Sequence, residues 1–124
     1  MSNRQVVEKY FEFVDNEDYD ALESLFASDA ILHSAGGGER IGIERIMSFY
    51  RNVFIKFPKH RDVPSRIIET ADVIVVEIAF TGQSNTGVSV SFPAVDIFDF
   101  KDGKISSLSQ WVDTAAIETM LRPS

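Results

Sequence analysis

The hydrophobic periodicity of this 124-residue chain changes about half-way along, from the period of a helix to that of a strand. Before Pro58 the apolar residues recur every three or four positions, and from Val63 onward they alternate with polar residues or form short continuous runs. The two periods bury side chains in incompatible ways, so each half favours one type of structure. The sequence therefore predicts an α+β fold in which helices come first and a mainly antiparallel sheet follows.

Three helices are predicted in the first half. A Ser2-x-x-Gln5 capping box opens a helix over residues 2–16, and a shorter helix follows over about 18–29. The clearest helix covers residues 43–57, where one wide apolar stripe ends at Pro58. We expect this long helix to lie across the sheet.

The remaining elements are mostly strands. A short strand is expected at 30–34, before Gly36-Gly37-Gly38, which we interpret as a flexible turn and at most as the rim of a pocket, because no phosphate-binding pattern surrounds it. Asp102-Gly103 is typical of a two-residue hairpin turn. The other expected strands cover 63–69, 73–81, 89–100 and 105–113, with a polar loop at 82–87. Thr114 is expected to cap a last short helix that runs through Leu121.

The composition excludes several classes of protein. The length fits one domain over residues 1–124. The absence of cysteine rules out disulfides and thiolate metal sites, and it favours a reducing, cytoplasmic location. The net charge of -7 opposes phosphate binding, so no nucleic-acid partner is expected. No signal peptide is visible and no apolar run approaches the roughly 18–20 residues that cross a bilayer, so no membrane association is expected.

Two polar residues are predicted to point into the protein. Alternation along residues 94–100 places Asp96 on the same face as Phe98, and burial among aromatic rings would raise the pKa of its carboxyl. The alternative is a strand aspartate that pairs with a surface cation, with a bulge at Pro93 resetting the alternation. Tyr10 lies on the apolar stripe of the first helix, so its ring should face inward and its hydroxyl should seek a hydrogen-bond partner. The alternative is that Tyr10 is simply a core residue with a polar tip.

Other candidates for chemistry are less well defined. The same alternation places Asp113 on one face with Ile105 and Trp111, where it is either a pocket acid or a neighbour of a helix cap. His33 adjoins Ser34 on the first strand, and His60 is predicted to lie in a loop. The two histidines are far apart and no metal-binding or serine-hydrolase motif is present, so we expect no metal and no other cofactor.

The order of these elements resembles the nuclear transport factor 2-like superfamily over almost the whole chain. The motifs that carry the resemblance are Asp18 to Ala30 (DYDALESLFASDA), Gly42-x-Glu44-x-Ile46, and the ending from Asp102-Gly103-Lys104-Ile105 to Trp111-Val112-Asp113. Within the superfamily the chain is most similar to SnoaL-like proteins and bacterial ketosteroid isomerases. The resemblance implies three N-terminal helices packed on a strongly curved antiparallel (mixed) sheet, which forms a cone with an apolar pocket.

The resemblance also implies roles for the candidate residues. Tyr10 and Asp96 match the two hydrogen-bond donors of the steroid-isomerase oxyanion hole, whereas Ser34 stands where that family has its aspartate base. In SnoaL-like cyclases the acid/base aspartate matches Asp113, and His33 could assist it. The expected catalytic residues are thus Tyr10, Asp96, Asp113 and His33.

The resulting hypothesis is an enzyme that isomerises, cyclises or hydrates a small hydrophobic carbonyl compound through an enolate. The alternative is a non-catalytic domain of the same fold that binds a ligand or dimerises. In either case we expect a homodimer formed through the sheet, whose outer face would carry Ser89, Ser91 and Val95. The residues expected to bind the substrate are Ser34, Tyr50, Phe54, Phe98 and Trp111.

Overall fold

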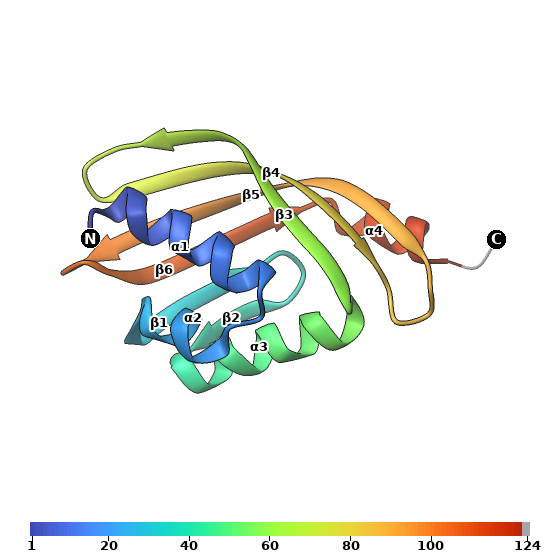
Figure 1. Cartoon of the computed structure of the whole chain (residues 1–124), viewed down its shortest axis with the longest axis horizontal. Coiled ribbons are helices and arrows are strands. Elements are labelled where there is room, and N and C mark those ends of the chain that lie inside the picture. The colour runs from blue at the N-terminus through green and yellow to red at the C-terminus, as the bar shows by residue number, and fades with distance from the viewer. Residues whose placement is uncertain (123–124) are drawn as a thin grey trace.

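Helices cover one face of a curved six-stranded sheet in the computed structural model, which describes residues 1–122 (Figure 1). The helices are α1 (Asn3–Asp15), α2 (Tyr19–Ser24), α3 (Ile43–Lys56) and α4 (Thr114–Leu121). The strands are β1 (Phe26–Ser34), β2 (Gly38–Ile41), β3 (Lys59–Glu69), β4 (Val73–Gln83), β5 (Ser89–Lys101) and β6 (Lys104–Val112). The predicted α+β class is confirmed.

The sheet has the strand order β2-β1-β6-β5-β4-β3. All neighbouring strands pair antiparallel except β1 and β6, which run parallel, so the sheet is mixed. In Figure 1 the sheet is visibly curved, with β3 crossing in front of the other strands on the side of α1. The concave side is covered by α1 and α3, and the main core lies between these helices and the sheet.

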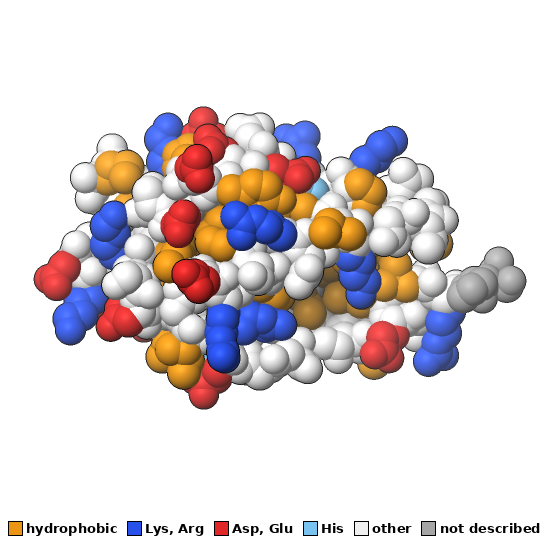
Figure 2. Space-filling view, turned by 90° about the horizontal axis from the view of Figure 1, so that it is seen from below, with side chains coloured by type: hydrophobic (Ala, Val, Ile, Leu, Met, Phe, Trp, Pro, Cys, Tyr) orange, Lys and Arg blue, Asp and Glu red, His pale blue; other side chains and the backbone are white. Residues whose placement is uncertain are grey.

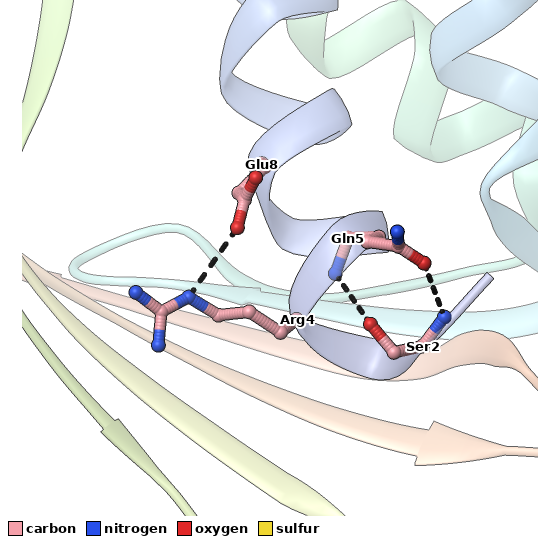
Figure 3. A network of polar contacts seen from close by, with 4 residues as sticks. All are labelled: Ser2, Arg4, Gln5 and Glu8. Atoms are coloured by element: carbon pink, nitrogen blue, oxygen red, sulfur yellow. Dashed lines mark hydrogen bonds and ion pairs between the residues drawn. The ribbon is translucent and has the colours of Figure 1, made fainter.

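The predicted capping box of α1 is confirmed and is shown in Figure 3. The backbone N–H of Gln5 donates to Ser2 Oγ at 3.1 Å, and the Ser2 N–H donates to Gln5 Oε1 at 2.8 Å. Arg4 and Glu8 form an exposed ion pair one turn further on, with Arg4 Nε 3.5 Å from Glu8 Oε1. The cap fixes the start of α1, so the apolar stripe through Tyr10 faces the sheet.

Some predicted boundaries are wrong because strand pairing overrides the local pattern. Helix α2 ends at Ser24 rather than near residue 29, since Phe26 already pairs with Ile105 of β6. Strand β2 follows the predicted glycine turn and was not expected. Residues 82 and 83 extend β4 into the expected loop. Strand β3 begins at Lys59 rather than 63, so His60 lies in a strand and not in a loop.

The largest correction concerns β6. Phe100 pairs with Ile105, but Asp99 pairs with Ser107, so Ser106 is an extra residue on β6 and its hydroxyl donates to the Asp99 carbonyl at 3.1 Å. This bulge reverses the alternation after Ile105. Trp111, predicted to share a face with Ile105, is instead 54% exposed on the outer face of the sheet.

The hairpin turn and the last helix agree with the sequence. Both Asp102 and Gly103 have positive φ, of 53° and 77°, as the two-residue turn requires. Helix α4 runs through Leu121 as expected, but it already begins at Thr114, and its N-cap is Asp113 rather than Thr114. Within residues 1–122, no helix is both long enough and apolar enough to cross a membrane.

Candidate active site

A cavity of about 120 Å³ lies between helices α1 and α3 and the concave face of the sheet. Figure 2 shows the face of the molecule that carries α3, on which hydrophobic side chains reach the surface in a hollow beside Lys and Arg side chains. Most of the cavity wall is apolar, and its polar members are Tyr10, Tyr50, His60, Asp62, Asp96 and Gln110. The cavity is therefore suited to a hydrophobic ligand that carries a few polar groups.

Two tyrosines from different helices meet at the cavity. The hydroxyl oxygens of Tyr10 on α1 and Tyr50 on α3 are 2.6 Å apart, and Gln110 Nε2 donates to the Tyr10 hydroxyl at 3.2 Å. Burial, with the nearby Tyr50 and Asp96 adding to it, raises the pKa of Tyr10 well above its usual value. Burial likewise raises the pKa of Tyr50. One of the two hydroxyl protons forms the hydrogen bond between the tyrosines. The other hydroxyl proton can therefore be donated to a ligand.

Asp96 is the most unusual group of the cavity. It is 4% exposed on β5, and no side chain or backbone N–H of residues 1–122 donates a hydrogen bond to its carboxyl. The β4–β5 register is continuous through Pro93, so the bulge considered there is absent and the predicted inward face is confirmed. Burial, and next the negative charge of Asp62, raise the pKa of Asp96 well above its usual value. Burial thus favours the unionised form of Asp96, which can donate a hydrogen bond.

Strand β3 adds a second acid and a histidine to the cavity wall. Burial and then the charge of Asp15 raise the pKa of Asp62 to about 6, against a smaller opposite effect of His60. The Asp62 backbone N–H donates to Asp15 Oδ1 at 3.2 Å. The His60 ring stacks on Phe54 at 4.4 Å, and its Nε2 lies 3.2 Å from Glu17 Oε2. Asp62 therefore changes its protonation state near pH 6 and is mostly ionised at neutral pH.

The structure brings four predicted site residues to the cavity and leaves five outside its wall. Tyr10, Tyr50, Phe54 and Asp96 line the cavity. Phe98 is fully buried in the core against Tyr10, and Trp111 lies on the outer face of the sheet. Ser34 Oγ accepts a hydrogen bond from Arg40, and His33 lies beside Glu39. Asp113 is the N-cap of α4. The Asp113 carboxylate accepts from the Ala116 N–H at 2.9 Å.

Sequence reasoning missed Asp62, His60 and Gln110. The alternation His60-x-Asp62 was a usable signal, since it places both side chains on one face once β3 is known to begin at Lys59. Gln110 faces the cavity because of the bulge at Ser106, which the sequence pattern does not reveal. No group of three or more His, Asp or Glu side chains in residues 1–122 could hold a metal ion.

Comparison with known proteins identifies the family. The model of the SnoaL-like domain matches residues 7–108. The chain belongs to this SnoaL-like family. The predicted resemblance, including the cone-shaped nuclear transport factor 2-like fold, is confirmed. A search of curated proteins found no significant match.

Several solved structures share this fold. An NTF2-like protein of unknown function from Burkholderia pseudomallei is 23% identical with a TM-score of 0.92, over 99% of this chain and 100% of that one. A protein from Jannaschia sp. assigned as a SnoaL-like polyketide cyclase is 21% identical with a TM-score of 0.90, over 98% and 93%. An LEH-like epoxide hydrolase from M. tuberculosis is 19% identical with a TM-score of 0.80, over 94% and 86%. At these identities the likeness establishes the fold of the SnoaL-like chain.

Proposed function

We propose that this SnoaL-like protein is an enzyme that acts on a small hydrophobic carbonyl compound by acid/base enolate chemistry, of isomerase, cyclase or hydratase type. The observation that carries the proposal is the presence, on the wall of one largely apolar cavity, of two acids: Asp96, whose unionised form is favoured by burial, and Asp62, whose pKa is about 6. Two acids with separated pKa values divide the roles of hydrogen-bond donor and proton acceptor. The names of the polyketide cyclase and epoxide hydrolase neighbours support a small-molecule enzyme.

The proposed reaction begins with the carbonyl oxygen of the substrate bound by the Asp96 hydroxyl and by the free proton of the Tyr10–Tyr50 pair. The Asp62 carboxylate removes a proton from the carbon next to the carbonyl, and the C–H electron pair moves to form an enolate. The two donors stabilise the negative oxygen as it develops. Protonated Asp62 then returns its proton to carbon, which completes an isomerisation. Alternatively, the enolate carbon attacks the carbon of a second carbonyl of the same molecule, and the proton on Asp62 passes to the alkoxide oxygen that forms there.

This proposal assigns proton transfer to Asp62 rather than to the residues that the resemblance implied. Ser34 lacks a carboxylate and its Oγ accepts a hydrogen bond from Arg40 Nη1 at 2.7 Å. The Asp113 carboxylate caps α4 and is not among the cavity-lining groups. Asp62 is the carboxyl on the cavity wall that is ionised in a substantial fraction of molecules at neutral pH.

The test is exchange of the α-protons of aryl ketones in D₂O, followed by proton NMR between pH 5 and 9. We expect catalysed exchange that rises with pH around 6 and is lost in Asp62→Asn. Asp113→Asn is the matched control, since it removes the charge of an aspartate outside the cavity and should exchange at the wild-type rate. Exchange no faster than in buffer, or equal rates in wild type and Asp62→Asn, would refute the proposal.

The alternative function is ligand binding without turnover. It is supported by the missing carboxylate at Ser34 and by the largely apolar cavity. In that case aryl ketones should bind, with chemical-shift changes at the signals of the cavity residues, while their α-protons exchange only at the rate of buffer.

We also propose a homodimer formed through the outer face of the sheet, in a cytoplasmic protein. Trp111, 54% exposed, lies opposite Val95 on this face, and the absence of cysteine supports the location. In ultracentrifugation at micromolar concentration, Trp111→Ser should shift the protein towards monomer. Ile55→Ser, at a 67% exposed position on α3, is the control that should leave the dimer intact. A monomeric wild type would exclude the dimer.

A further inference from the structure

A second hollow lies next to the cavity and is lined by polar side chains. Its residues are Arg40, Glu44, Arg45, Ser48, Phe49 and Asn52. Phe49 belongs both to this hollow and to the wall of the cavity, so its side chain is common to the two spaces. A ligand that extends past Phe49 would contact the acids of the cavity at one end and the arginines at the other.

Arg40 is held in place without being neutralised. Its Nη1 donates to Ser34 Oγ at 2.7 Å, and its guanidinium carbon lies 4.6 Å from the centre of the Phe49 ring. The ion pairs formed within residues 1–122 do not include Arg40 or Arg45, and the adjacent Glu39 lies beside His33 instead. A chain with a net charge of -7 thus keeps a half-buried, oriented guanidinium with free N–H donors at the edge of its cavity.

The glycine turn makes room for this arrangement. A Cβ atom at Gly37 would clash with Ser34 Oγ and would lie 3.2 Å from Arg40 Nη1. The φ angle of Gly37 is not in the left-handed region, unlike those of Gly36 and Gly38. Gly37 is therefore needed for space beside the Ser34–Arg40 pair rather than for its backbone conformation.

We propose that Arg40, assisted by Arg45, binds a carboxylate of the substrate, so that the substrate is a hydrophobic keto acid rather than a neutral ketone. This inference rests on the proposed function for the carbonyl end of the ligand. The planar guanidinium matches a carboxylate in two parallel hydrogen bonds. Glu44 lines the same hollow, so the two arginines and one glutamate leave a net charge that suits a single carboxylate better than a phosphate dianion.

The test compares 4-oxo-4-phenylbutanoate with its methyl ester, which differ in the negative charge. Dissociation constants are measured by NMR titration of the wild type, and we expect the acid to bind at least about tenfold more tightly, with a preference that falls as salt is added. Arg40→Gln should remove the preference by weakening binding of the acid alone, and Arg40→Lys should keep part of it. Arg51→Gln is the matched control, because Arg51 is on α3 but lies over the Tyr19 ring, 5.1 Å from its centre.

Gly37→Ala is a second variant that leaves both arginines in place. It should displace the Ser34–Arg40 pair and reduce the preference for the acid without changing binding of the ester. Equal binding of acid and ester by the wild type, or a preference that survives in Arg40→Gln, would overturn this inference while leaving catalysed exchange of neutral ketones, and so the proposed function, intact. A preference lost in Arg40→Gln but with no catalysed exchange would support the carboxylate site and refute the enzyme.

Discussion

Two aspartates, one within β5 and one directly after the neighbouring strand β6, have opposite surroundings. Asp96 lies within β5, is 4% exposed, and faces a largely apolar cavity in which burial raises the pKa of its carboxyl. Asp113 follows β6 directly, is exposed, and accepts the Ala116 N–H as the N-cap of α4. The same side chain is a candidate proton donor in one place and a helix cap in the other. The difference shows that burial and partners, rather than residue type, decide what an aspartate does here.

Asp62 is a third aspartate to compare with these two, and its substitution should have the largest effect on the exchange rate. Asp62→Asn removes the proposed base and should lower the rate of α-proton exchange by about 100-fold or more, which is the typical contribution of a positioned base. Wild-type exchange should rise with pH through a midpoint near 6, since burial and Asp15 raise the pKa of Asp62 to about 6. The variant should show no such rise. A wild-type midpoint near 4 would contradict the assignment.

Asp96→Leu tests the buried member of the pair. Exchange should fall by about 100-fold, because an oxyanion donor is lost. The free energy of unfolding should not fall, since no side chain or N–H donates to this carboxyl and leucine adds apolar contacts with the cavity wall. Rates are measured by NMR and stability by urea unfolding. Asp96→Asn keeps a donor and should lose less activity than Asp96→Leu, and the reverse order would argue against hydrogen bonding by Asp96.

The stability of the wild type should depend on pH through Asp62. The pKa of Asp62 is about 6 in the folded protein, against an ordinary value of 3.8 for an aspartate, so the folded state binds more protons between these pH values. The stabilisation is fully present below about pH 4 and is lost as pH rises through 6, amounting to about 1–3 kcal/mol. Urea unfolding should find wild type and Asp62→Asn similar near pH 4 and the variant more stable at pH 7.5. A difference that does not change with pH would contradict this linkage.

Substitution of the exposed aspartate, Asp113, should have the smallest effect on activity and stability. Asp113→Ala removes the N-cap of α4 and should cost about 1 kcal/mol of stability, with exchange activity within twofold of wild type. Thermal unfolding and the exchange assay measure the two effects. A loss of activity comparable to that of Asp96→Leu would place Asp113 in the chemistry and remove the distinction between the two aspartates.

Much of the architecture was predictable because local patterns were unbroken. The long helix ends before Pro58 as expected, and the alternation along β5 correctly placed Asp96 inward. The predictions failed where pairing with a distant strand decided the outcome. Lys59–Asp62 became part of β3 through pairing with β4, and the extra residue Ser106 turned Trp111 outward and Gln110 inward.

The sequence by itself determined the order of helices and strands, the capping box, and the faces of elements that have a regular period. Only the tertiary structure decided which polar groups share the cavity. The 2.6 Å contact of Tyr10 with Tyr50, the position of Arg40 over Phe49, and the raised pKa of Asp62 all join elements far apart in the chain. Hydrophobic period is a local property, whereas burial and charge proximity depend on every element packed around a group.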